Sequence, residues 1–240
     1  MGTRFVLFLC CSLSLLASHP KKVINYEVSY IGIPLLDMVL TWEEKDSSVH
    51  ISYDNKLKPF IAYFHEIHNT YTVEFDKNSF SPLSWSKTVL EGDLQFQLSA
   101  ERSGYGRTVN FSNGETKDFP TNAYTVFSAT HYLASKASQA DYFPATIKVF
   151  IDGEIWQARA YRFDRDNPHP EHHLESDEIL IQTDLHYLSG KSLIADNDIL
   201  TNVIATEGTQ FLLWVTPEGT YTKAQFGRFP KAVLLNMIKN

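Results

Sequence analysis

The stretch Ile24-Asn25-Tyr26-Glu27-Val28-Ser29-Tyr30 decides the fold class. Apolar or aromatic side chains alternate there with polar ones, at the period of two that places neighbouring side chains on opposite faces of a β-strand. The same alternation returns in 38–42, 49–53, 71–75, 94–98, 147–151, 211–215 and 233–237. One apolar and one polar face are typical of an antiparallel sheet with one wet side. The sequence therefore predicts a mainly β protein.

Turn residues separate these segments. Asn113-Gly114 and Asp152-Gly153 can supply the positive φ angles that tight hairpins need. Pro217-Glu218-Gly219 and Glu91-Gly92-Asp93 mark two further turns. Successive hairpins favour one large curved antiparallel sheet, an open or partly closed barrel, over βαβ units.

One segment departs from the strand pattern. In residues 123–138 the apolar side chains recur at helical spacing and alanine is frequent. Asn122 or Thr121 is a candidate N-cap. We expect a single amphipathic helix there, packed on the sheet between two β-rich halves. Residues 164–177 and 189–198 are expected to be loops, because they are rich in charge, Gly, Pro or His.

The start of the chain has the character of an export signal. Arg4 precedes a nearly unbroken apolar run at 5–16, and Ala17 follows with a small side chain. The run is shorter than the roughly 20 residues that cross a bilayer, so we expect a cleavable signal at 1–17 and no permanent transmembrane helix. Both cysteines, Cys10 and Cys11, lie within it. Lipoprotein anchoring at either cysteine is the weaker alternative, and the periplasm is the expected location.

Composition narrows the possible partners. The 43% of hydrophobic and 13% of aromatic residues suffice for a folded core, and we expect residues 18–240 to form a single β-rich domain. A net charge of −7 argues against nonspecific binding of nucleic acid. The partners to expect are a lipid or an envelope protein, and no motif calls for a cofactor.

The sharpest cluster of reactive side chains is His169-Pro170-Glu171-His172-His173. Imidazoles suit Zn²⁺, so His169, His172 and His173 are the candidate metal ligands. Their place on a loop lacks the rigid support that a catalytic metal needs. A solvated loop is therefore the favoured interpretation, and weak zinc binding is the alternative.

No constellation identifies catalytic residues. His65-Glu66-Ile67-His68 places its histidines three apart, whereas the zinc-protease helix needs them four apart. The nucleophile-elbow motif Gly-x-Ser-x-Gly and the phosphate-binding glycine loops are absent. We therefore assign no catalytic residue.

Four stretches carry short motifs that are considered together: the helix with Ser128-Ala129 and Tyr132-Leu133, the hairpin at 213–218, and residues 26–32 and 75–82. These motifs resemble features of the DUF3108 family of exported bacterial proteins. Thr125 and Glu218 stand where the family pattern has Asp. The resemblance implies an envelope protein with a curved sheet and transfers no catalytic residue.

These observations favour a non-enzymatic periplasmic protein that binds a hydrophobic, lipid-like ligand in a curved-sheet groove or docks on an envelope partner. Two alternatives stay open. One is a hydrolase acting on cell-wall or lipid material, and the other is a purely structural interaction module. The many aromatic residues could line a groove or could simply fill the core.

Overall fold

The computed structural model describes residues 21–62, 66–103, 106–175, 177–194, 197–228 and 232–238. The predicted signal at 1–17, with Cys10 and Cys11, and His65 of the rejected motif at 65–68 lie outside these residues. The strands of the first half are β1 (Lys21–Tyr30), β2 (Ile33–Glu44), β3 (Ser48–Leu57), β4 (His68–Asp76), β5 (Pro82–Glu91), β6 (Leu94–Arg102), β7 (Thr108–Phe111) and β8 (Thr116–Asp118). Those of the second half are β9 (Ala123–Thr125), β10 (Ala145–Ile151), β11 (Glu154–Phe163), β12 (Ile179–Gly190), β13 (Gln210–Val215), β14 (Tyr221–Phe226) and β15 (Val233–Met237). The helices are α1 (Pro59–Ala62), α2 (Val126–Ser135) and α3 (Ile199–Ile204), with a 3₁₀ turn at Ala140–Tyr142.

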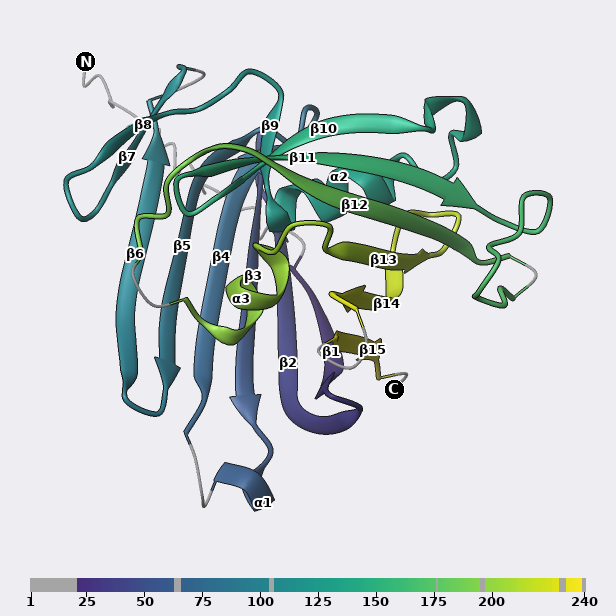
Figure 1. Cartoon of the computed structure of the whole chain (residues 1–240), viewed down its shortest axis with the longest axis horizontal. Helices are drawn as coiled ribbons and strands as arrows, with labels where there is room; N and C mark the ends of the chain where they lie inside the picture. The colour runs from purple at the N-terminus through teal and green to yellow at the C-terminus, as the bar shows by residue number, and fades with distance from the viewer. Residues whose placement is uncertain are drawn as a thin grey trace, which may run out of the picture.

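All 15 strands of the described residues belong to one sheet. Its order is β8-β7-β6-β5-β4-β3-β2-β1-β15-β14-β13-β12-β11-β10-β9, so two meanders meet where the first strand pairs with the last. Every neighbouring pair is antiparallel except β9 with β10, and the sheet ends in open edges at β8 and β9. In Figure 1 the long strands β2–β6 form one wall, β11 and β12 cross in front of its upper end, and α3 lies in front of the wall below them. Helix α2 contacts both β4 and β10. The predicted mainly β fold with one large curved antiparallel sheet, an open or partly closed barrel, is confirmed, and the sheet is not closed.

Helix α2 lies where the periodicity predicts it, but its start is different. Residues 123–125 form the short strand β9, so neither Asn122 nor Thr121 caps the helix. The N-cap is Thr125, whose hydroxyl accepts a hydrogen bond from the backbone N–H of Ser128, while the Ser128 hydroxyl accepts one from the N–H of Thr125. This reciprocal pair is a capping box with serine at the third helical position.

The prediction that residues 189–198 form a loop is partly wrong. Residues 189–190 complete β12, and Asp198 is the N-cap of the short helix α3. Six residues are too few to show a helical period in the sequence. The Asp198 carboxylate accepts a hydrogen bond from the N–H of Thr201 at 2.9 Å and so satisfies one of the free donors at the start of α3.

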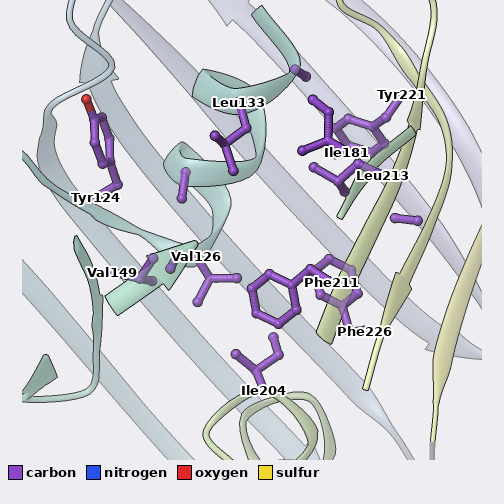
Figure 2. Close-up of a cluster of buried hydrophobic side chains, with 14 of the residues drawn as sticks. Tyr124, Val126, Leu133, Val149, Ile181, Ile204, Phe211, Leu213, Tyr221 and Phe226 are labelled. Atoms are coloured by element: carbon purple, nitrogen blue, oxygen red, sulfur yellow. The ribbon is translucent and has the colours of Figure 1, made fainter. Parts of the chain in front are cut away.

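The main core fills the space inside the curved sheet. Inward-facing side chains of both meanders pack there against α2 and α3. Figure 2 shows Leu133 of α2, Ile204 of α3 and Phe211 of β13 in this one buried cluster. A smaller cluster around Phe111, Phe119 and Phe150 fills the space near β6–β8.

The β1–β2 hairpin contains a strained residue. Tyr30 pairs with Ile33, so Ile31 and Gly32 are the two turn residues, with φ of 53° and 75°. Such a turn suits Asn-Gly, whereas a β-branched side chain at positive φ is strained.

We expect Ile31→Asn to raise the free energy of unfolding by about 1 kcal/mol, because asparagine tolerates this conformation. Urea denaturation measures the change. Ile33→Asn is the matched control, since Ile33 is also exposed but lies in a strand. An unchanged or lowered stability of Ile31→Asn would show that the turn carries no such strain.

Candidate functional site

An apolar cavity, here the inner cavity, lies inside the curved sheet where β1 ends and β2 begins. Leu36 and Met38 of β2, Leu213 of β13, Phe226 of β14 and Leu200 of α3 are among its lining residues. Its wall is almost wholly apolar and its volume is about 80 Å³. A single water needs only roughly 10–15 Å³, and genuinely empty cavities in proteins are apolar. The inner cavity is therefore larger than a gap that holds one water molecule, and its apolar wall suits an apolar occupant.

The polar groups in this wall bond to one another. Asn69 donates to a carboxylate oxygen of Glu91 at 2.5 Å and accepts from the N–H of Leu90 at 3.1 Å. Asn55 donates to the backbone carbonyl of Asn69 at 3.3 Å, and the Thr130 hydroxyl donates to the carbonyl of Phe127 at 2.8 Å. Because these groups already have partners, the wall does not require a polar ligand.

Four ring side chains lie between the inner cavity and a second hollow inside the curved sheet. The Tyr53 hydroxyl lies 2.7 Å from Nε2 of His131 and 3.3 Å from the hydroxyl of Tyr221. Tyr26 donates to the backbone carbonyl of Tyr221 at 3.0 Å, and their rings stack at 5.7 Å. We call Tyr26, Tyr53, His131 and Tyr221 the partition. Tyr53 lines the inner cavity, and Tyr26 and His131 line the second hollow on the other side of the partition. Tyr221 lines both.

Burial keeps the partition uncharged. It lowers the pKa of His131 to about 3 and raises the pKa of Tyr26, Tyr53 and Tyr221 above the usual tyrosine value. The partition is therefore a set of neutral hydrogen-bonding groups across the physiological pH range.

The second hollow, here the outer cleft, opens where β1 begins and β2 ends. Its volume is about 460 Å³. Aromatic side chains line its depth, and Lys21, Lys22, Glu44 and Glu218 lie at its rim.

A buried ionic cluster joins the two meanders beside the inner cavity. Lys87 of β5 lies 2.5 Å from a carboxylate oxygen of Asp152, in the β10–β11 turn, and 3.0 Å from one of Asp198. Lys87 also donates to the hydroxyl of Thr201 at 3.2 Å, and Tyr71 of β4 donates to Asp198 at 2.9 Å. Lys87 is 7% exposed and Asp198 is fully buried, so their attraction acts with little screening by water.

The carboxyl groups of this region respond differently to burial. Burial works to raise the pKa of Asp198, but the charge of Lys87 and the hydrogen bonds from Thr201 outweigh it, so this pKa lies below the usual value. Burial raises the pKa of Asp152 despite the opposing charge of Lys87. Burial also raises the pKa of Glu91, whose carboxylate accepts from the N–H of Ile199.

The ionic cluster has the contacts of a structural anchor. The two oxygens of Asp198 accept hydrogen bonds from Tyr71, Lys87 and both the N–H and the hydroxyl of Thr201. A general base needs a lone pair directed at substrate, and Asp198 has four donors in place. We therefore interpret this cluster as the attachment of α3 to β4 and β5.

Two buried polar residues, Lys87 of the ionic cluster and His131 of the partition, could have been recognised from the sequence. Lys87 follows the alternation Trp85-x-Lys87-x-Val89 and so takes an inward position that an apolar residue would normally fill. His131 lies four residues after Phe127 on the apolar side of the predicted helix. A charged or polar residue at an apolar position of a periodic pattern marks a buried network.

The candidate metal residues lie on the outer face of the sheet. Nδ1 of His169 accepts from the N–H groups of Glu171 and His172, so its Nε2 carries the proton and donates to Gln182 at 2.8 Å. His172 packs edge-on against Trp214, and Leu174 packs with the outward-facing Leu180 and Leu212. The loop is thus more than a solvated excursion, because part of it covers apolar strand residues.

Zinc binding by this loop stays a prediction. His169 and His172 are neighbours, with ring centroids 4.7 Å apart, and His173 is exposed. Across the described ranges, no three His, Cys, Asp or Glu side chains are arranged to hold a metal ion. His68, from the other histidine motif, lies in β4 and contacts Asp54 at 2.8 Å.

Comparison with known proteins supports the fold. No family model matches the chain, and no curated protein matches it. A similar solved structure is the crystal structure of a β-barrel-like protein of domain of unknown function DUF1849 from Brucella abortus. The TM-score is 0.54 at 10% identity, over 92% of this chain and 96% of that chain. At this identity the likeness concerns the fold alone, and membership of DUF3108 stays a prediction.

None of the helices in the described part of the chain has the length and apolar character needed to cross a membrane.

We expect Lys87→Met to lower the free energy of unfolding at pH 7 by about 3–5 kcal/mol, because two buried carboxylates lose their cation. Guanidinium denaturation measures the loss. Without the cation the buried carboxylates bind protons more readily than in the unfolded chain, so the loss relative to the wild type should shrink as the pH falls from 7 towards 5. Lys77→Met, which breaks the exposed pair with Glu44, should cost less than about 1 kcal/mol. Equal losses in the two variants would contradict the anchoring role.

His131 should give the protein an acid sensitivity. Its pKa is about 3 in the folded state and about 6.5 when exposed, so the unfolded chain takes up the proton first. The stability is complete above about pH 6.5 and is lost as the pH falls, by about 2 kcal/mol between pH 8 and pH 5. Comparing urea denaturation of the wild type and His131→Gln at both pH values isolates this component. The exposed His173→Gln is the control, and an identical pH dependence in all three proteins would refute the assignment.

Proposed function

We propose that the chain is a non-enzymatic binding protein of the cell envelope and that the inner cavity holds the alkyl part of a hydrophobic, lipid-like ligand. The inner cavity carries the proposal, because an apolar wall with satisfied polar groups favours an apolar guest. Its volume fits the end of an alkyl chain rather than a whole lipid. The envelope location rests on the predicted signal at 1–17 and on the resemblance to exported proteins.

The hydrolase alternative would need a reactive group with a free lone pair in a cleft. The ionic cluster has perturbed pKa values, but hydrogen bonds from neighbouring residues occupy Asp198. The structural alternative draws support from the partition, since four rings fill the middle of the curved sheet. The remaining cavity is what favours binding over a purely structural role.

Neutral alcohols of increasing length, from 1-hexanol to 1-decanol, test the cavity by isothermal titration calorimetry. Each buried methylene contributes about 0.8 kcal/mol, so the affinity should rise about fourfold per carbon until the cavity is full. Affinity that does not depend on chain length would contradict the proposal.

Ala224→Leu should block this binding. Ala224 is 1% exposed and lines the inner cavity, so three added carbons would occupy the space of the guest. We expect at least a tenfold loss of 1-decanol affinity with the melting temperature kept or raised, because filling a cavity commonly stabilises a fold. Gln225→Leu, the next residue on β14 and outside the cavity lining, is the matched control. Unchanged decanol binding in Ala224→Leu would place the guest elsewhere.

A further inference from the structure

We propose that the outer cleft is a second binding site and that its ligand is an amphipathic anion, a flat apolar body carrying one acidic group. The site is separate from the inner cavity, because the partition lies between them. The proposal therefore does not depend on whether the inner cavity binds a chain.

Aromatic side chains from four separate elements line the outer cleft. They are Trp42 near the end of β2, Phe80 in the β4–β5 turn, Tyr26 of β1 and Tyr221 of β14. Rings from distant parts of the chain can grip a flat apolar ligand on several sides at a small cost in side-chain entropy. A volume of about 460 Å³ lies within the range of small-molecule sites.

Phe80 has a backbone conformation that is unfavourable for a phenylalanine. Phe80 has a φ of 57°, in the left-handed region that Gly and Asn normally occupy. The Asp76 carboxylate fixes this turn by accepting from the N–H of Asn78 and of Ser79 at 3.1 and 2.8 Å. The Phe80 ring stacks on Phe75 at 5.3 Å and lines the cleft. Local strain of this kind concentrates at functional sites.

The buried residue His131 also leaves one polar atom for a ligand. His131 is 8% exposed, and its Nε2 is engaged by Tyr53. Its other nitrogen, Nδ1, has no hydrogen-bond partner among the described residues, and His131 lines the cleft. Since the ring is neutral, Nδ1 can donate or accept according to the tautomer that Tyr53 selects.

The charges at the rim favour an anion. Glu44 is already paired with Lys77 at 2.6 Å and accepts from the indole N–H of Trp42 at 3.4 Å. Lys21 and Lys22 are exposed and have no ion-pair partner in the part of the chain that the structure describes. The cleft lining then holds two lysines without an ion pair and one remaining carboxylate, Glu218, in a chain whose net charge is −7. Glu43 stands opposite Lys21 in the β1–β2 ladder and lies outside the lining. An acidic group at the rim would complement the two lysines.

Three probes that share one body and differ in charge test this proposal. They are 2-naphthoate, 2-naphthalenemethanol and 2-naphthylmethylammonium, titrated into the full protein by isothermal calorimetry in low salt. We expect the naphthoate to bind about fivefold more tightly than the alcohol and the ammonium to bind most weakly. The advantage of the naphthoate should shrink in 0.5 M NaCl, because salt screens exposed charges. Equal affinity of the three probes, or tightest binding of the ammonium, would overturn the proposal.

Surface variants locate the acidic group without disturbing the core. Lys21→Gln/Lys22→Gln should remove the preference for the naphthoate and leave the affinity of the alcohol unchanged. Lys56→Gln/Lys148→Gln changes the net charge equally at exposed positions outside the cleft lining and should keep the preference. A loss of preference in both double variants would mean that only the net charge of the protein matters.

Two further variants test the aromatic grip and its independence from the inner cavity. Phe80→Leu and Trp42→Leu should each weaken all three probes at least tenfold, with the fold checked by circular dichroism. Ala224→Leu should leave naphthoate binding intact while it weakens 1-decanol binding at least tenfold. Naphthoate binding that disappears in Ala224→Leu and persists in Phe80→Leu and Trp42→Leu would assign the probe to the inner cavity and end the proposal for the cleft. Loss of decanol binding alone would bear only on the inner cavity.

Discussion

The pairing of β1 with β15 is the constraint on which the rest of the structure depends. Apart from the parallel pair β9–β10, each of the two meanders consists of antiparallel neighbours in chain order, and among the described residues only the β1–β15 pair joins them within the sheet. It sets strands from opposite ends of the chain side by side, with Tyr26 opposite Met237 and Tyr30 opposite Val233. The entropic cost of closing so long a loop grows only with the logarithm of its length. Burial of the inner faces of both meanders against each other can therefore offset it.

The partition follows from this arrangement. With β15 between β1 and β14, Tyr26 of the first meander and Tyr221 of the second lie close enough to stack, and Tyr53 of β3 reaches the same point from the first meander. Buried tyrosine hydroxyls need partners, and here they find one another, His131 and a backbone carbonyl. The sequence left open whether the aromatic residues line a groove or fill the core. In the structure they do both, in different parts of the space inside the curved sheet.

The sequence predicted the local structure, the strands and the turns, but few of the contacts between distant parts of the chain. Alternation and turn residues located the strands around Tyr26, Tyr53 and Phe211, because period and turn chemistry are local properties. The start of α2 was missed because Thr125 caps the helix only after the parallel pairing of β9 with β10, which no local pattern encodes. The three histidines at 169–173 drew attention as ligands, whereas two of them pack on the outer face of the sheet. Lys87 and Asp198 meet across 111 residues, and only the tertiary fold brings them together.

The ionic cluster also decides the shape of the inner cavity. Replacing a buried ion pair by apolar side chains is often neutral for stability, so stability alone does not explain why Lys87 and Asp198 occur here. Their geometric effect is specific: Asp198 begins α3, and the next two residues, Ile199 and Leu200, form part of the cavity wall. An apolar contact would leave α3 free to shift, whereas directed hydrogen bonds fix its position. The wall of the inner cavity thus depends on charges beside it, while the outer cleft, beyond the partition, is built from rings and rim charges that the ionic cluster does not touch.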